Sequence, residues 1–288
     1  SYLAATTGRG AEGNQLGRGD NRFLVTSKAL FCRGRDNGAS RWRYESEGRV
    51  ITNSTICIGD NGVYFFETAA PVCVSDADGR VLMADFVEGG AEELVKLDRA
   101  TGEVVWRRQH DMRCRHVFHL SCARDVLVAS GCTTVDGNYW YHLRAYRAAD
   151  GAVLWRQDLD SSYADSDTDH GKQDKHPMII GDTVQLKHGS FDLATGKPLG
   201  IRFGTSNCAD CAASKNHVFT RNGGVATIIN LAEGGEGKPL CSVMRPGCYI
   251  SIIPAGGIVL LPAFSAGCTC DYTIQTSIAW LPRRKAAE

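Results

Sequence analysis

A short phrase recurs along this chain of 288 residues, and it constrains the fold more than any other feature. In its two fullest copies, at residues 97–106 and 146–155, a glycine is followed four residues later by a tryptophan. Shorter copies occur at residues 36–42, 191–199 and 230–234. A small supersecondary unit repeated in this way indicates a stacked or circular repeat architecture.

Each copy has the pattern of two strands joined by a turn. In the copy at 97–106, Asp98 can accept hydrogen bonds from turn amides and Gly102 can adopt the positive φ that side chains resist. Trp106 has the largest apolar surface of the unit, so we expect it to fill the space between one small sheet and the next. Separate hairpins of a β-sandwich are the alternative, but sandwiches rarely repeat one turn phrase. The key repeat positions are Gly38, Trp42, Asp98, Gly102, Trp106, Gly151, Trp155, Asp192 and Gly196.

The spacing of the phrases favours propeller blades. The five aligned glycines are separated by 64, 49, 45 and 38 residues, close to the roughly 40–50 residues of a four-stranded blade. The longest gap contains residues 67–92, which we interpret as a polar loop insertion, and no amphipathic helix is evident. The sequence therefore predicts an all-β fold, a β-propeller of four-stranded antiparallel blades, with about six blades or as part of a larger propeller.

Strands between the phrases are expected as hairpins. Their turns are predicted at residues 59–62, 123–125 and 254–257, where glycine, proline or aspartate interrupts apolar and β-branched runs.

The motif Asp-x-x-Thr-Gly-x-x-x-Trp at 98–106 resembles the repeat of pyrroloquinoline-quinone (PQQ)-type propellers. That repeat is shared by quinoprotein dehydrogenases and by cofactor-free relatives such as the outer-membrane assembly lipoprotein. Segments 245–257 and 267–277 resemble the C-terminal end of large PQQ-like propeller proteins of planctomycete-type bacteria, and segments 50–56 and 176–182 fit the same group.

The resemblance implies a propeller domain over residues 22–282. Residues 1–21 are then an N-terminal segment that supplies an edge strand of a partial blade, and residues 283–288 are a polar tail. Such propellers often have about eight blades, whereas 288 residues suffice for about six. We therefore expect either a processed C-terminal portion, with the missing blades on another chain, or a complete six-bladed ring.

Charge and hydropathy exclude some classes of partner. Lys plus Arg and Asp plus Glu balance at 32 each, and no basic stripe is present, which argues against binding to nucleic acid. The longest apolar stretch is broken by prolines and glycines, so no membrane span is expected.

Twelve cysteines indicate an oxidising compartment, so the predicted location is extracytoplasmic: periplasmic, cell-surface or secreted. Free core cysteines and a metal site are the alternatives. A hairpin folded at Arg124 brings Cys114 near Cys132, which predicts a disulfide. Further disulfide candidates are Cys208, Cys211, Cys241, Cys248, Cys268 and Cys270.

One polar cluster has the residue types of a metal site. Asp169, His170, Asp174 and His176 could hold calcium or a transition metal, although their spacing does not match an EF-hand. A solvated loop between blades is the simpler interpretation and the favoured one.

Two motifs of cofactor-bearing quinoproteins are missing from the sequence. No two cysteines are adjacent, and Ala212 follows Cys211 where a c-type haem site requires histidine. No cofactor is therefore expected, with PQQ and calcium as the alternative.

We predict a non-catalytic extracytoplasmic propeller that serves as a binding or assembly module in a larger complex. Its partner is expected to be another protein, a second propeller fragment or a copy of itself. A PQQ-dependent oxidoreductase, or a processed fragment of one, is the alternative function.

Asn53 begins a formal glycosylation sequon, or is simply a turn residue.

Overall fold

The computed structural model of the chain describes residues 2–6, 23–87, 90–110, 114, 116–135, 138–160, 176–186, 189–200, 211–222, 225–233, 236–241, 252–262 and 277–281. Contacts divide the chain into two compact units. The first contains Ser1–Ala164 with Leu193–Gly196, and the second contains Asp165–Asp192 with Lys197–Glu288. The expected all-β class is confirmed, because antiparallel sheets make up most of the described residues of both units.

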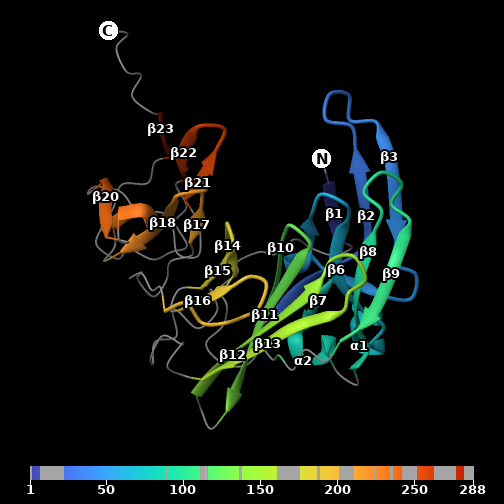
Figure 1. The fold of residues 1–288 in the computed structure, drawn as a ribbon. Helices are drawn as coiled ribbons and strands as arrows, with labels where there is room; N and C mark the ends of the chain where they lie inside the picture. The colour runs from blue at the N-terminus through green and yellow to red at the C-terminus, as the bar shows by residue number, and fades with distance from the viewer. Residues whose placement is uncertain are drawn as a thin grey trace. The chain divides into compact units, whose positions relative to one another are not determined.

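The first unit begins with a three-stranded antiparallel meander, drawn in blue in Figure 1. Its strands are β1 (Tyr2–Thr6), β2 (Phe23–Arg33) and β3 (Ser40–Glu45). Trp42 and Tyr44 alternate along β3 with exposed residues, which is the period-2 pattern of a strand with one buried face.

A four-stranded meander follows and is joined to the first through pairing of β2 with β4. Its strands are β4 (Val50–Thr52), β6 (Val63–Thr68), β8 (Glu92–Leu97) and β9 (Val104–Gln109). The short β5 (Cys57–Ile58) forms the predicted hairpin with β6, and the amide of Gly59 closes its turn on the carbonyl of Gly62 at 2.9 Å. Asn53–Thr55 form a 3-10 helix, η1.

The segment 67–92 is not the polar loop that the sequence suggested. It contains α1 (Pro71–Ser75), β7 (Arg80–Leu82) and α2 (Met83–Phe86). β7 pairs with the beginning of β2, and Cys73, Met83 and Phe86 are almost fully buried. The insertion is therefore part of the core of the first unit. Neither helix among the described residues has the length and apolar character needed to cross a membrane.

The third meander of the first unit is a regular four-stranded antiparallel sheet. It comprises β10 (His116–Ala123), β11 (Val126–Val135), β12 (Asn138–Arg147) and β13 (Val153–Leu159). The hairpin between β10 and β11 turns at Arg124, which has a φ of 53°. This register places His116 opposite Cys132.

The second unit contains three further meanders. The first has β14 (Met178–Ile180), β15 (Thr183–Leu186) and β16 (Gly189–Asp192). The second has β17 (Ala212–Ala213), β18 (His217–Asn222), β19 (Val225–Asn230) and β20 (Gly237–Cys241), with the 3-10 helix η4 (Leu231–Glu233) after β19. The third has β21 (Ile253–Ala255), β22 (Ile258–Leu261) and β23 (Ile278–Trp280).

The last hairpin differs from its prediction. Pro254 and Ala255 belong to β21 and pair with β22, so the turn is the dipeptide Gly256-Gly257 rather than residues 254–257. Both glycines have positive φ, which allows the chain to reverse in two residues.

Four of the five repeated phrases form the same turn. The amide of its first residue donates to the carbonyl five residues later, over 2.8 Å from Gly34, 2.7 Å from Asp98, 2.8 Å from Arg147 and 2.9 Å from Asp192. The glycine at the fifth position has a φ between 65° and 77° in all four. The fifth phrase differs, because Leu231–Glu233 form a 3-10 helix.

Candidate functional site

The repeat tryptophans of the first unit each lie against the glycine of the next turn. A Cβ added to Gly102 would come within 2.6 Å of the Trp42 ring, and one on Gly196 within 2.5 Å of the Trp155 ring. A Cβ on Gly151 would come within 2.9 Å of the Trp106 ring. Glycine is therefore required at these positions for two reasons: the backbone has a positive φ, and the indole approaches too closely for a side chain.

Two of the three indoles also donate a hydrogen bond to that turn. The Nε1–H of Trp42 donates to the carbonyl of Arg99 at 3.1 Å, and that of Trp155 to the carbonyl of Leu193 at 2.9 Å. Arg99 and Leu193 occupy the same position of the repeated turn. The sequence predicted the tryptophans as spacers between sheets, but it did not predict these hydrogen bonds.

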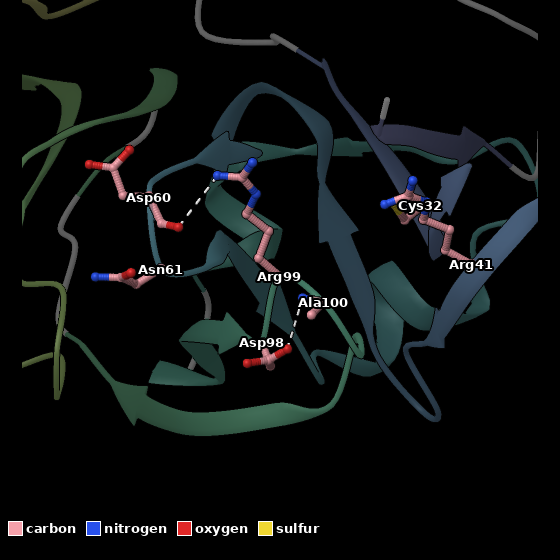
Figure 2. A pocket seen from close by; sticks show the side chains of 7 residues that line it. All are labelled: Cys32, Arg41, Asp60, Asn61, Asp98, Arg99 and Ala100. Atoms are coloured by element: carbon pink, nitrogen blue, oxygen red, sulfur yellow. Dashed lines mark hydrogen bonds between the residues drawn. The ribbon is translucent and has the colours of Figure 1, made fainter. Parts of the chain in front are cut away.

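A pocket opens beside the turn that receives Trp42. It has a volume of about 550 Å³ and lies within the first unit. Figure 2 shows Asp60 and Asn61 on one side, Arg41 and Cys32 on the other, and Arg99 between them. The lining residues are Cys32, Arg41, Asp60, Asn61, Asp98, Arg99 and Ala100.

Part of this lining is held in place by hydrogen bonds. The Oδ1 atom of Asp98 accepts hydrogen bonds from the backbone amides of Ala100 and Thr101, both at 2.8 Å. The N–H groups of Thr101 and Ala100 hold the pKa of Asp98 below its usual value, so its carboxylate is ionised at neutral pH. Arg99 reaches from this turn to the carbonyls of Gly59 and Asp60, each at 3.4 Å, and so joins two walls of the pocket (Figure 2).

The remaining lining groups are available to a ligand. Among the described residues, the guanidinium of Arg41, the carboxylate of Asp60 and the amide of Asn61 have no hydrogen bond or ion pair. All three side chains belong to exposed residues. The pocket thus offers a cation, an anion and a neutral amide on fixed strands and a short turn, and these groups suit a polar ligand of mixed charge.

A second polar cluster is buried between β3, β6 and β9. The side chain of Glu67 is 0 % exposed and accepts hydrogen bonds from Tyr44 at 2.7 Å and Ser46 at 2.9 Å. Arg107 lies 3.3 Å from the other carboxylate oxygen and also donates to Tyr44. Burial and the charge of Glu67 raise the pKa of Tyr44, so its hydroxyl remains a donor. A glutamate directly after the apolar run 63–66 was a signal that the sequence interpretation overlooked.

A third polar group crosses β11, β12 and β13. The ring of His142 has Nε2 at 2.7 Å from Thr133 Oγ1 and Nδ1 at 2.6 Å from Asp158 Oδ1. Arg144 binds the same Asp158 oxygen at 2.8 Å. A base and a hydroxyl are thus adjacent, but the arginine neutralises the carboxylate that would support a catalytic imidazole. We assign these contacts to cross-linking of the three strands.

The predicted disulfide candidates are only partly within the described residues. No disulfide joins Cys114 to Cys132 in the structure, although both cysteines are buried. Burial, with the nearby Cys132, raises the pKa of the Cys114 thiol. Cys211 and Cys241 are half-buried and form no disulfide with another described cysteine. Cys208, Cys248, Cys268 and Cys270 lie outside the described residues, so their pairing remains a prediction.

The candidate metal cluster also falls mainly outside the described residues. Asp169, His170 and Asp174 lie outside the described residues. His176 is described, and its Nδ1 lies 3.2 Å from the carbonyl oxygen of Pro177. Within the described part of the chain, no group of three or more potential ligands is arranged to hold an ion.

Asn53 uses its side-chain oxygen to accept a hydrogen bond from Ser27 at 2.7 Å.

Comparison with known proteins identifies the family. A family model, PQQ_2, described as "Outer membrane protein assembly factor BamB", matches residues 32–202, which is more than half of the chain. A comparison with curated proteins finds no significant match.

Several solved structures are similar. BamB from Moraxella catarrhalis shares 14% identity with a TM-score of 0.47, over 90% of this chain and 68% of that chain. Quinohemoprotein alcohol dehydrogenase from Comamonas testosteroni shares 13% identity with a TM-score of 0.47, over 84% of this chain and 50% of that chain. The WD40 β-propeller domain of Doa1 shares 10% identity with a TM-score of 0.38, over 85% and 73% of the respective chains.

The repeated turns, the docked tryptophans and the antiparallel meanders define a propeller protein of the PQQ-repeat class. Within that class, the chain belongs to the family described as outer membrane protein assembly factor BamB. The resemblance to planctomycete-type proteins remains a prediction.

Proposed function

We propose that the chain is a non-catalytic, extracytoplasmic propeller that binds another protein as a module of a larger complex. The observation that carries this proposal is the pocket at the Trp42-docked turn, whose fixed walls present unpaired polar groups. The description of the matching family as an outer membrane protein assembly factor supports both the assembly role and the extracytoplasmic location.

The chemistry of the pocket suggests what part of a partner would enter it. Arg41 and Asp60 carry opposite charges on facing sides, and Asn61 offers both a donor and an acceptor. A loop or terminus of a partner that carries both an acidic and a basic or amide group would satisfy all three. The complementary charges would fix its orientation more than they raise its affinity.

A cofactor-independent function is part of the proposal. It is supported by the sequence, which contains neither adjacent cysteines nor a Cys-x-x-Cys-His motif. The residues lining the pocket are those of a polar binding site rather than of a site for a planar quinone, which would favour aromatic and apolar walls.

Selection from a random peptide library displayed on phage would test the proposal. We expect peptides that bind the purified chain with micromolar affinity, and at least about tenfold weaker binding to Arg41→Glu and to Asp60→Lys. Arg156→Glu is the matched control, because Arg156 is an exposed arginine on β13 that does not line the pocket. Equal binding to all variants would show that the peptides do not bind in this pocket. Bound quinone in the absorption spectrum of a monomer that oxidises an alcohol would reject the whole proposal.

A further inference from the structure

Two cysteines from neighbouring meanders share one apolar cluster next to a strand that leads into the pocket wall. Cys57 lies on β5 and is 8 % exposed, while Cys122 lies on β10 and is half-buried. Cys57 is part of the apolar cluster against which Cys122 packs. Contact between β5 and β10 brings the two cysteines together, although the sequence separates them by 65 residues, from 57 to 122.

The pair is connected directly to one wall of the pocket. β5 ends at Ile58 and leads into the turn at residues 59–62, where Asp60 and Asn61 line the pocket. The sulfur of Cys122 lies 3.5 Å from the point where a Cβ on Gly59 would stand. The carbonyls of Gly59 and Asp60 also accept hydrogen bonds from Arg99, another lining residue. A change at the thiol pair therefore acts on the backbone that positions the free carboxylate of Asp60.

We propose that Cys57 and Cys122 are a reversible disulfide site that fastens the Asp60–Asn61 wall of the pocket to the neighbouring meander. The disulfide itself stands on the contact of the two thiols, and only its effect on partner binding rests on the proposed function. This pair is distinct from the cysteines that the sequence suggested as staples.

The reaction is thiol–disulfide exchange with a small-molecule disulfide such as oxidised glutathione. Cys122 loses its proton and attacks one sulfur of the small disulfide, which releases one thiolate. Cys57 then loses its proton and attacks the Cys122 sulfur of the mixed disulfide, which releases the second thiolate. Two protein thiols are oxidised, one small disulfide is reduced to two thiols, and the two protons pass to those thiols.

The environment indicates which thiol reacts first. The hydrogen bond from Cys57 lowers the pKa of Cys122, and Cys122 is the more exposed of the two. The hydrogen bond with Cys122 and burial raise the pKa of Cys57. Cys122 is therefore the attacking thiol and Cys57 the resolving thiol.

Mass spectrometry after incubation of the full chain in glutathione buffers would test the disulfide. The sample is blocked with N-ethylmaleimide and digested with trypsin and a glutamyl endopeptidase. The second protease is needed because one tryptic peptide, 50–80, contains both Cys57 and Cys73, and cleavage after Glu67 separates them. We expect the Cys57 peptide linked to peptide 116–124 in oxidised buffer, and its loss after reduction. Blocked thiols at both positions in fully oxidised buffer would overturn the proposal.

Thermal unfolding and hydrogen exchange would test the consequence for the pocket. We expect oxidation to raise Tm by about 4 °C or more in the wild type and to slow amide exchange at residues 59–62. Neither change should occur in Cys122→Ser or Cys122→Ala. Cys73→Ala should keep both changes, because Cys73 neither lines the pocket nor belongs to the pair. Unchanged exchange at 59–62 despite a formed disulfide would overturn the link to the pocket. Loss of peptide binding in both redox states would reject the proposed function and leave the disulfide standing.

Discussion

The two junctions between the meanders of the first unit are built differently, although the same repeat forms both. At the first junction, Trp42 docks on Gly102 with its indole hydrogen-bonded, and the buried Glu67 binds Tyr44 of the neighbouring meander. At the second junction, Trp106 docks on Gly151, but its indole N–H has no hydrogen-bond partner among the described residues. There the ring of His110 packs at a tilt of 51° against Tyr146, with ring centroids 4.3 Å apart.

The difference begins in the turn sequence. The turn that receives Trp42 starts with Asp98, whose carboxylate binds two turn amides, whereas the turn that receives Trp106 starts with Arg147. Asp150 compensates in part by accepting from the amide of Ala152 at 3.1 Å. Packing of tryptophan on glycine therefore suffices for docking, while the polar contacts around it vary between junctions.

The largest expected effect concerns the buried carboxylate of the first junction. Replacing Glu67 by Gln leaves Arg107 beside a neutral amide, and we expect a loss of about 3–5 kcal/mol in the free energy of unfolding. Glu45→Gln is the control, because Glu45 is exposed and its ion pair with Arg43 lies at the surface. It should cost less than about 1 kcal/mol. Equal losses in urea denaturation would show that the first junction does not depend on its buried charge.

A pH effect is expected at the second junction. Burial, with the charges of Arg156 and Arg108, lowers the pKa of His110 from 6.5 to about 4. Between these values the unfolded chain binds a proton that the folded chain does not, so stability falls as the pH drops from 6.5 towards 4. His110→Gln should flatten this part of the curve of Tm against pH. An identical fall of Tm in the wild type and the variant would contradict the assignment.

The smallest effect separates the two indoles directly. Trp42→Phe and Trp106→Phe remove similar ring surface, but only the first removes a hydrogen bond, that to Arg99. We therefore expect Trp42→Phe to cost about 1 kcal/mol more than Trp106→Phe. Parallel chemical denaturation of the two variants measures this difference, and a larger cost for Trp106→Phe would reverse our interpretation of the junctions.

The local parts of the fold were predictable because their causes are local. Asp98 and Gly102 specify a turn within six residues, and the spacing of such turns specified successive meanders. Asp125 and the glycine pair at 256–257 marked two chain reversals for the same reason, although the second turn is tighter than expected.

The insertion and the pocket depend on contacts that the sequence does not display. β7 has only three residues, too few for a periodic pattern, and its partner β2 lies more than 50 residues earlier. Cys32, Asp60 and Arg99 come from three separate segments, and nothing in their local sequence places them around one pocket. Likewise, Cys57 and Cys122 meet only because β5 and β10 belong to neighbouring meanders.

The eleven residues of β2 have a consequence for how the first unit comes apart. Phe23–Val25 pair with β7, Thr26 and Ser27 with β4, and residues 29–33 with β3, while β1 covers the opposite edge. Because β2 pairs with four other strands, neither of the first two meanders can detach unless the hydrogen bonds along β2 break. The two meanders therefore form a single cooperative unit, and they should lose structure in one transition rather than one meander at a time.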